Sequence, residues 1–499
     1  MTSLIREMLK FFATAEAVSI LARLREFLAG RKIDCYVVGG FIRDGLMMRT
    51  NSDIDVAVAG DARAIADEVA REFGARMVPL DDVNQVARVV LAGYERRWHL
   101  DFATLRGGIE EDIRCRDFTV NAIAVKLAES SDDWSRVEVI DPLGGCDDLN
   151  YKLVRKVSDE CFEHDPVRLI RAIRLAAMLD FSLEPSTEAL IKHNSELITS
   201  VSTERVRDEL YYILETPRTY KSLRHLDRLE LLDSLMPELT ATRGATQPNE
   251  HYWDVFDHSL ETVAAAERLL REGDGNTTDE IISTVPWTPE ISQHFDREVA
   301  GGRTRRAMLK LAALLHDIAK PATKTTEQDG RIRFLGHPKQ GAEMAARLME
   351  RLRFSKREIK TVQLMIEHHL RPGFLVREGI PSNRAIYKYF RDTADVGIDT
   401  LFLALADHLA ARGPMLDPDQ WREHVETTRY ILNKWSREQD TVVPPKLIDG
   451  HVLIDELGLT PGPQIGELLE IIREAQAAGE LKTSGEALDL VKKRLGNNQ

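Results

Sequence analysis

The stretch VGGFIRD (residues 38–44), followed by SDIDV (residues 52–56), predicts a strand, a glycine turn, a short helix and a second strand. Alternate residues of a strand point to the same face, so Asp53 and Asp55 present two carboxylates on one side. Like charges this close are unfavourable unless a cation lies between them. The glycine turn brings backbone N–H groups within reach of a phosphate. The stretch therefore predicts metal-assisted transfer of a nucleotidyl group from a nucleoside triphosphate.

Each half of this stretch, taken separately, has a simpler structural interpretation. A Gly-Gly pair is most often a turn, and an Asp-x-Asp triplet is most often part of a solvated loop. The order of the two, the apolar strands around them and the pair Arg43-Asp44 between them favour the catalytic interpretation.

Length and composition indicate a large protein without membrane segments. The 499 residues correspond to about three domains at roughly 150 residues each. Hydrophobic residues make up 43% of the chain, and no apolar run approaches the roughly 20 residues of a membrane span. The first residues lack the basic-then-apolar layout of a secretory signal. The net charge of −14 argues against non-specific coating of nucleic acid.

The four cysteines indicate a reducing compartment. Cys35, Cys115, Cys146 and Cys161 show neither the spacing of a zinc site nor a disulfide framework. We therefore expect a cytoplasmic protein.

The periodicity of the apolar residues changes along the chain and predicts an α+β multi-domain fold. Residues 1–30 are expected to form one amphipathic helix. Short β-branched runs alternate with helical ones over residues 31–150, which predicts an α/β head. Residues 151–242, 243–425 and 426–499 carry helical spacing, which predicts an all-α neck and body, a second all-α domain and a helical C-terminal tail.

Two further segments of the head carry polar groups suited to the same chemistry. Asp101 lies on the apolar segment HLDF and is expected beside Asp53 and Asp55 in the sheet, as a metal ligand or general base. A strand-end aspartate at the sheet edge is an equally good interpretation of this residue. The segment RDFTVNA contains Arg116, whose guanidinium fork suits phosphate oxygens.

The segment DPVRLIRAIR (residues 165–174) predicts a helix with a cationic face. Asp165 suits the N-cap position, and the proline after it suits the first helical turn. Arg168, Arg171 and Arg174 recur every three residues, so they turn only slowly around one face. No acid interrupts them, which indicates an anionic partner.

These motifs resemble those of the bacterial class II tRNA nucleotidyltransferase and poly(A) polymerase family. The resemblance runs in order through GGFIRD, SDIDVAV, RDFTVNAIA, DPLGGCDDL and DPVRLIRAIRLAA, within residues 33–235. It implies a small polymerase-beta-like nucleotidyltransferase head followed by a helical neck and body. It also implies an enzyme that uses CTP and ATP to add CMP and AMP to the 3′ end of tRNA, with CC-only addition and poly(A) addition as alternatives.

The resemblance also assigns roles to residues. It implies that Asp53 and Asp55 hold Mg²⁺ and that Asp165 and Arg168 pair with the Watson–Crick edge of the incoming CTP or ATP. An aspartate acceptor and an arginine donor satisfy the amine and ring nitrogen that cytosine and adenine share, whereas guanine and uracil present a carbonyl there. The remaining residues implied at the nucleotide are Gly39, Gly40, Arg43, Arg116, Asp117, Asn121, Arg171 and Arg174.

The chain departs from the family pattern at two places. His164 stands where the family usually has a glutamate before the templating aspartate. Only residues 107–113 separate Arg106 from Arg114, where the family usually has a longer flexible loop. A short loop resembles the CC-adding members of the family.

A second constellation of polar residues lies in the region 251–412, which contains eight of the 14 histidines. Its order of histidines and aspartates resembles the HD superfamily of metal-dependent phosphohydrolases. The resemblance implies a core metal site and a second metal held by His337 and His368, with His369 as the competing choice. It also implies that Lys320 contacts phosphate. The implied core ligands are His258, His316, Asp317 and Asp407.

Nitrogen ligands of this kind favour Mn²⁺, Ni²⁺ or Zn²⁺ over Mg²⁺. The sequence thus predicts two separate sites: Mg²⁺ in the head, and a transition metal with phosphohydrolase activity in the HD domain. An alternative from another class is an HD phosphohydrolase whose head only binds RNA. Presence of both Asp53 and Asp55 argues against it. The oligomeric state is left open.

Overall fold

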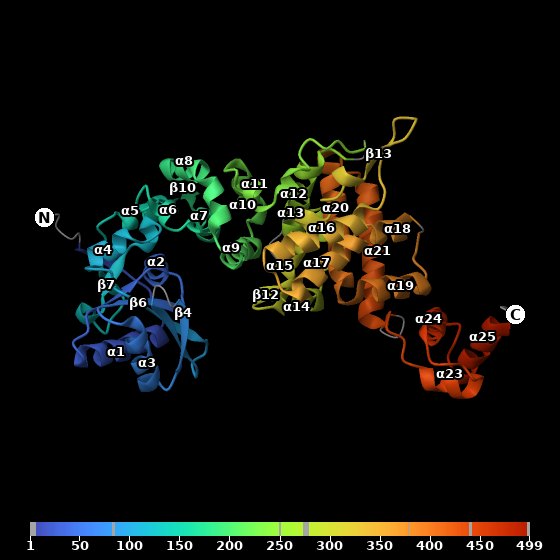
Figure 1. The fold of residues 1–499 in the computed structure, drawn as a ribbon, viewed down its shortest axis with the longest axis horizontal. Coiled ribbons are helices and arrows are strands. Elements are labelled where there is room, and N and C mark those ends of the chain that lie inside the picture. The colour runs from blue at the N-terminus through green and yellow to red at the C-terminus, as the bar shows by residue number, and fades with distance from the viewer. Residues whose placement is uncertain are drawn as a thin grey trace. The chain divides into compact units, whose positions relative to one another are not determined.

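The computed structural model describes residues 6–81, 85–248, 251–272, 279–377, 379–438 and 442–496 (Figure 1). It divides into two compact units, which are described separately. The first unit comprises Met1–Val201 with Leu229–Leu231, and the second comprises Ser202–Arg228 with Leu232–Gln499. An α/β head followed by helical domains confirms the expected α+β fold class.

One eight-stranded sheet forms the centre of the first unit, in the order β1-β8-β7-β2-β3-β6-β5-β4. Strands β3 and β6 are parallel, and the other neighbours in the sheet are antiparallel. The strands are β1 (Arg6–Lys10), β2 (Cys35–Val38), β3 (Asp53–Val58), β4 (Arg76–Asp81), β5 (Val86–Leu91), β6 (Trp98–Thr104), β7 (Ala124–Lys126) and β8 (Arg136–Ile140).

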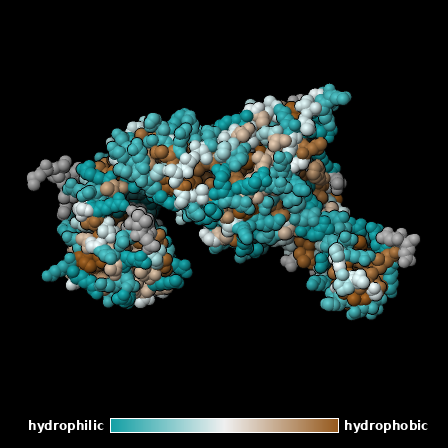
Figure 2. Space-filling view, in the orientation of Figure 1, coloured by the Kyte–Doolittle hydropathy of each residue, from teal (hydrophilic) through white to brown (hydrophobic). Residues whose placement is uncertain are grey.

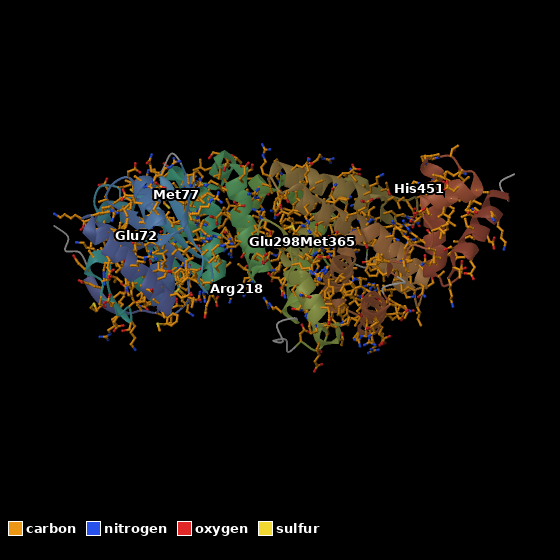
Figure 3. All side chains as sticks on the ribbon, turned by 90° about the horizontal axis from the view of Figure 1, so that it is seen from below. Glu72, Met77, Arg218, Glu298, Met365 and His451 are labelled. Carbon is orange, nitrogen blue, oxygen red and sulfur yellow. The ribbon has the colours of Figure 1, made fainter. Side chains whose placement is uncertain are left out.

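Helices connect and cover these strands, and a short parallel pair of strands follows the sheet. The helices of this unit are α1 (Ala15–Gly30), α2 (Gly40–Leu46), α3 (Ala62–Phe73), α4 (Ile109–Arg114), α5 (Gly145–Tyr151), α6 (Cys161–His164), α7 (Arg168–Leu179) and α8 (Pro185–His193). The parallel pair is β9 (Leu153–Val154) with β10 (Ser182–Leu183). In Figure 3, Glu72 and Met77 label α3 and the strand β4 that follows it.

The alternation of side chains along β3 separates the core from the site. Ile54, Val56 and Val58 point into the main hydrophobic core of the head, which also takes the apolar faces of α1 and α3. Asp53 and Asp55 therefore lie on the opposite face, which they share with Ala57. On this face Asp53 is exposed and Asp55 is half-buried.

The expectation of a single helix over residues 1–30 is wrong in its first part. Arg6–Lys10 forms strand β1, which pairs antiparallel with β8 at the edge of the sheet. The helix begins only at Ala15, where the Thr14 side chain accepts a hydrogen bond from the Ala17 N–H and caps it. The apolar spacing of this segment fits a helix or a strand. It forms a strand because it can pair with the edge of β8.

The second unit is mainly helical. Its helices up to the end of the HD region are α9 (Thr203–Glu215), α10 (Thr219–Arg228), α11 (Leu231–Leu235), α12 (Pro237–Thr240), α13 (Val255–Glu272), α14 (Pro289–Asp296), α15 (Arg305–Leu315), α16 (His337–Arg351), α17 (Lys356–His368), α18 (Arg371–Arg377), α19 (Asn383–Thr393), α20 (Gly397–Arg412) and α21 (Pro418–Arg437). Two hairpins interrupt them, β11 (Glu298–Ala300) with β12 (Arg303–Thr304) and β13 (Lys324–Thr326) with β14 (Ile332–Phe334).

Helix α15 lies at the centre of the HD region. Its residues from Ala307 to Leu315 are all buried, and it packs against α9, α13, α17 and α20. Strand β11 lies against α17, where Glu298 and Met365 are labelled in Figure 3. A helix buried on all sides brings any polar group at its end into the interior, and His316 directly follows α15.

The chain ends in three helices with a hydrophobic core of their own, called the tail below: α23 (Gly450–Leu457), α24 (Pro463–Ala477) and α25 (Ser484–Gly496). His451 labels α23 in Figure 3. The boundary expected at residue 425 falls inside α21 and is corrected, because that helix continues to Arg437. None of the described helices combines the length and apolar character needed to cross a bilayer. The face of the second unit shown in Figure 2 is mostly hydrophilic.

Candidate functional site

The three acids of the head lie on neighbouring strands. Parallel pairing of β3 with β6 sets Asp55 opposite Asp101 and Asp53 opposite His99. Burial raises the pKa of Asp55 to about 6, and the nearby carboxylates of Asp101 and Asp53 add to this effect while Arg116 opposes it. Such crowding of negative charge is the condition under which a divalent cation binds favourably.

Gly39 fits this site because it has no side chain. Its φ of +74° favours glycine, and a Cβ at this position would lie 2.6 Å from Oδ2 of Asp55. The next residue, Gly40, begins helix α2, and its backbone N–H donates a hydrogen bond to the Asp55 carboxylate. The turn therefore brings the backbone close to the Asp55 carboxylate, and the expected approach to a phosphate stays a prediction.

A cavity of about 280 Å³ lies over Asp55 and Asp101, and Asp53 is not among the described residues that line it. Its floor consists of the glycine turn and the strands β3 and β6, and its wall brings together cationic and amide side chains. The lining residues are Val38, Gly39, Gly40, Asp55, Val56, Val86, Asp101, Ala103, Arg116, Asp117, Asn121 and Arg171. A carboxylate floor facing two guanidinium groups suits a metal-bound polyphosphate.

A chain of hydrogen bonds orients the wall of this cavity. Asn121 donates to Oδ1 of Asp117 at 3.1 Å and accepts a hydrogen bond from Nη1 of Arg43 at 2.7 Å. Arg171 lies 3.5 Å from the other carboxylate oxygen of Asp117. Burial raises the pKa of Asp117, but Arg171 and these hydrogen bonds outweigh it and leave the pKa lowered.

Arg43 stands behind the wall rather than in the cavity. Its guanidinium is buried, forms a two-point ion pair with Asp44 and bonds Asn121. Neither Arg43 nor Arg174 is among the described residues that line the cavity. In this structure Arg43 supports Asn121, and its contact with a nucleotide stays a prediction.

Asp165 and Arg168 lie beside the motif that contains Arg116. Arg168 donates from Nη2 to the Cys115 carbonyl at 3.0 Å and from Nη1 to the Arg116 carbonyl at 3.1 Å. Its Nε lies 4.0 Å from Oδ2 of Asp165. Neither Asp165 nor Arg168 is among the described residues that line the cavity. The backbone carbonyls of residues 115 and 116 hold the guanidinium of Arg168 close to Arg116, which does line it.

Helix α7 begins later than expected. Asp165 has extended backbone angles after the short helix α6, and a turn at Pro166 and Val167 precedes the first helical residue, Arg168. Val167 occupies the N-cap position without a side-chain hydrogen bond, so the N-cap assignment of Asp165 is corrected.

Two residues at the head acids were missed by the sequence analysis. Arg88 on β5 lies opposite Asp101 and donates from Nε and Nη2 to its two carboxylate oxygens, both at 2.7 Å. His99 contacts Oδ1 of Asp53 through Nδ1 at 2.6 Å. The alternating pattern of β5 places Arg88 on one strand face, but the pairing of β5 with β6 is not readable from the sequence.

A second polar cluster forms at the ends of the HD helices. His258 comes from α13, His316 and Asp317 follow α15, and Asp407 comes from α20. The Nε2 atom of His258 lies 3.2 Å from Nε2 of His316 and 3.0 Å from Oδ1 of Asp407. His258, His316 and Asp317 are fully buried or nearly so. Buried ionisable groups this close together fit a metal ion.

The backbone orients three imidazoles of this cluster. Nδ1 of His316, His337 and His369 each lies within hydrogen-bonding distance of the carbonyl three residues earlier, at 2.9, 2.7 and 2.7 Å. When Nδ1 donates this bond, Nε2 carries a lone pair, as in most metal-binding histidines. Nε2 of His337 is buried and has no hydrogen-bond partner, although it lies 3.3 Å from Oδ1 of Asp317. The cluster therefore fits a metal ion.

The structure corrects the choice of His368 as a ligand. His369 is buried, and its Nε2 lies 3.9 Å from Oδ1 of Asp317. Among the residues that the structure describes, two groups have atoms close enough to share an ion, one formed by His258, His316 and Asp407 and the other by His316, Asp317 and His369. His368 is part of neither, because consecutive residues at the end of α17 point in different directions.

The charges of this cluster are strongly coupled. Burial disfavours a charged imidazole, but the carboxylates of Asp317 and Asp407 outweigh it and raise the pKa of His316 to about 10. Burial lowers the pKa of His369 to about 3, and the neighbouring His316 adds to this effect. Asp317 has a pKa well below its ordinary value, since His316 and Lys320 overcome the effect of burial.

Lys320 connects the cluster to a polar rim. Its Nζ atom lies 2.5 Å from Oδ2 of Asp317 and donates to Oε1 of Gln247 at 2.6 Å. The same atom lies 3.4 Å from Nε2 of His251, whose pKa burial lowers to about 3. Gln247 and His251 were not among the predicted site residues, because they lie in an irregular segment whose position only the fold determines.

Comparison with known proteins identifies the domains that contain the two clusters. Three family models match the chain: the poly A polymerase head domain at residues 35–155, the "probable RNA and SrmB-binding site of polymerase A" at 180–242, and the HD domain at 255–412. The A-adding tRNA nucleotidyltransferase of Deinococcus radiodurans is 32% identical over 466 residues, which cover 92% of this chain and 94% of that protein. The CC-adding tRNA nucleotidyltransferase of Thermus thermophilus is also 32% identical, over 91% of this chain and 92% of that protein.

Solved structures share the fold. The complex of a CCA-adding enzyme with ATP has a TM-score of 0.64 at 24% identity and covers 97% of this chain and 96% of that one. The Thermotoga maritima CCA-adding enzyme complexed with tRNA has a TM-score of 0.61 at 24% identity, with the same coverage.

The head sheet and its carboxylate cavity define a nucleotidyltransferase, with an HD domain later in the chain. Domains of both kinds generally use divalent metal ions. The chain belongs to the tRNA nucleotidyltransferase and poly(A) polymerase family, as its motifs predicted.

Proposed function

We propose that this enzyme extends the 3′ end of tRNA with CMP and AMP taken from CTP and ATP. The observation that carries the proposal is the cavity in which Asp55 and Asp101 face Arg116 and Arg171. The relatives named for A and CC addition to tRNA support the substrate. We place the reaction in the cytoplasm, since all four cysteines are free.

The residues of the head would divide the work. Asp53 and Asp55 would hold Mg²⁺, which when bound activates the attacking oxygen and stabilises charge on the phosphates. Arg116 and Arg171 would bind phosphate oxygens, and Asn121 and Asp117 would orient them. Asp101, held by two hydrogen bonds from Arg88, would keep its carboxylate fixed beside Asp55.

A nucleotide-addition assay tests this proposal. The purified protein is incubated with transcripts of one tRNA that end before CCA, after C or after CC, with each nucleoside triphosphate separately and together. We expect CMP addition to the first two transcripts and AMP addition to the third. Absence of any addition to all three would contradict the proposal.

CC-only addition is the second candidate, and one feature of the head favours it. The connection between β6 and α4 comprises only residues 105–108, where the resemblance implies a longer flexible loop. Growth of the first transcript by two CMP residues without AMP addition to the third would identify this activity. AMP addition restricted to the third transcript would identify an A-adding enzyme, and repeated AMP addition a poly(A) polymerase.

Base choice is expected to depend on Asp165. We propose that Asp165 and Arg168 form the template, because their side chains lie together beside the cavity. Asp165→Ala should relax discrimination against UTP and GTP by roughly 10- to 100-fold, the effect of one or two lost hydrogen bonds to a base. The ratio of kcat/KM values for CTP and UTP measures it.

Glu163→Gln is the matched control for this variant, since it removes an exposed acid two residues away. Its selectivity should equal that of the parent. A variant Asp165→Ala with unchanged selectivity and only weaker tRNA binding would show that the templating role is wrong.

For the HD domain we propose a transition-metal site with phosphohydrolase activity. Its core ligands would be His258, His316, Asp317 and Asp407. A second ion would bind at Asp317 with His337 and His369. The imidazole nitrogens favour Mn²⁺, Ni²⁺ or Zn²⁺, and Lys320 at the rim would contact the phosphate of the substrate.

A further inference from the structure

One face of helix α19 is cationic and lies against the tail. Arg384, Lys388 and Arg391 follow the spacing i, i+4 and i+7, which places them on the same side of the helix. The first and last are about 10 Å apart along the helix axis, at 1.5 Å per residue. This row of three cations is called the basic face below.

Glutamates of the tail cover the basic face. Two belong to α24, and the third follows that helix. The ion pairs are Arg384 with Glu480 at 2.9 Å, Lys388 with Glu474 at 3.0 Å, and Arg391 with Glu470 at 2.8 Å and with Glu474 at 3.1 Å. A hydrogen bond from the Tyr387 hydroxyl to Glu470 at 2.9 Å joins them.

The side chains of these ion pairs are between 22% and 56% exposed, so a competing anion can reach them. The paired side chains of Arg384 and Glu480 are 45% and 56% exposed, and exposed ion pairs are individually weak and screened by salt. The tail has its own buried core, which includes Leu453, Leu468 and Val491. No described residue of α19 is part of that core.

The chemistry of the basic face suits an RNA strand. Guanidinium and ammonium groups bind phosphate oxygens as they bind carboxylates. A row about 10 Å long spans about three phosphates at ~3.4 Å per nucleotide of a duplex strand. One acid of the same helix, Asp392, pairs with Arg391 and Arg371 and would partly neutralise that end. Such a surface is notable in a chain whose net charge is −14.

We propose that the basic face of α19 binds the phosphate backbone of tRNA, and that Glu470, Glu474 and Glu480 cover it in the free protein as substitutes for phosphate. This inference rests on the proposed function for the identity of the RNA. Binding of tRNA at this face displaces α24. The tail therefore lowers the affinity of the free protein for RNA.

Neutralising the covering glutamates tests the inference. The triple variant E470Q/E474Q/E480Q is compared with D455N/E456Q/E467Q, which changes the net charge of the tail equally at exposed acids. Binding of a tRNA transcript lacking CCA is measured by fluorescence anisotropy between 50 and 200 mM salt. We expect the first variant to bind at least about five-fold more tightly than the control at the lowest salt.

The slope of log affinity against log salt concentration should also become more negative by about 2 to 3, because each phosphate contact contributes ~0.9 to it. Adding R384Q, K388Q and R391Q should reverse both changes. Equal binding by the two triple variants, with native circular dichroism, would overturn the inference. A gain that persists after the three cations are removed would also overturn it.

The nucleotide-addition assay keeps this result separate from the proposed function. Tighter binding by a protein that adds no nucleotide would leave the basic face as an RNA-binding surface and contradict the proposed activity. Normal nucleotide addition with unchanged tRNA binding would support the proposed activity and contradict the role of the basic face.

Discussion

Nucleotide addition is expected to fall by roughly 10³-fold or more in the variants Asp53→Ala and Asp55→Asn, because each loses a charged oxygen ligand whose metal is worth several kcal/mol in the transition state. Asp55 should give the larger loss. It lies opposite Asp101 and receives a hydrogen bond from Gly40, so it is at the centre of the site, whereas the side chain of Asp53 is 55% exposed. Single-turnover addition of CMP to a tRNA transcript lacking CCA measures the effect.

Glu138→Gln provides a control on the same sheet. This exposed residue of β8 is separated from β3 by two strands, and its replacement should leave the rate unchanged. Asn conserves the volume of Asp, so the Asp55 variant should fold and even relieve crowding of charge. Addition within ten-fold of the parent by a folded Asp55→Asn protein would show that the acids do not hold the catalytic metal.

The second large effect is expected in the HD domain. The double variant His316→Ala with Asp317→Ala should lose bound transition metal and any phosphohydrolase activity, because the two described groups of ligand atoms that lie close enough to share an ion both contain His316. Metal content after purification and dialysis is measured by mass spectrometry. CTP and ATP incorporation should remain within a few-fold of the parent, since Asp53 and Asp55 are unchanged.

Two single variants make this experiment specific. His369→Ala should lower metal content, whereas His368→Ala should not, because only His369 points toward Asp317. Equal metal loss in both would show that the end of α17 rearranges on binding. Collapse of nucleotide addition in the double variant, with native circular dichroism, would show that the two sites are coupled rather than independent.

The head chemistry was predictable because it depends on local periodicity. A period of two places Asp53 and Asp55 on one face of a strand whatever its neighbours are, and a left-handed turn needs Gly39. The motifs also identified the family, because their order along the chain is a property of the sequence alone. The same holds for the set of histidines and aspartates in the HD domain.

Pairing between distant segments was not predictable. The contact of Arg88 with Asp101 exists because β5 is the neighbour of β6, and a strand carries no signal for which edge it joins. The segment Arg6–Lys10 forms a strand for the same reason, since its apolar residues fit a helix equally well until β8 offers a free edge.

The sequence by itself thus determined the family and which residues are candidates for the chemistry, namely the acids of the head and the histidines and aspartates of the HD domain. Only the tertiary structure decided which of two adjacent histidines turns inward, that Arg43 supports Asn121 instead of lining the cavity, and that α24 covers α19. The physical reason is that side-chain type and spacing are local properties. Direction, burial and partner depend on how elements far apart in the chain pack together.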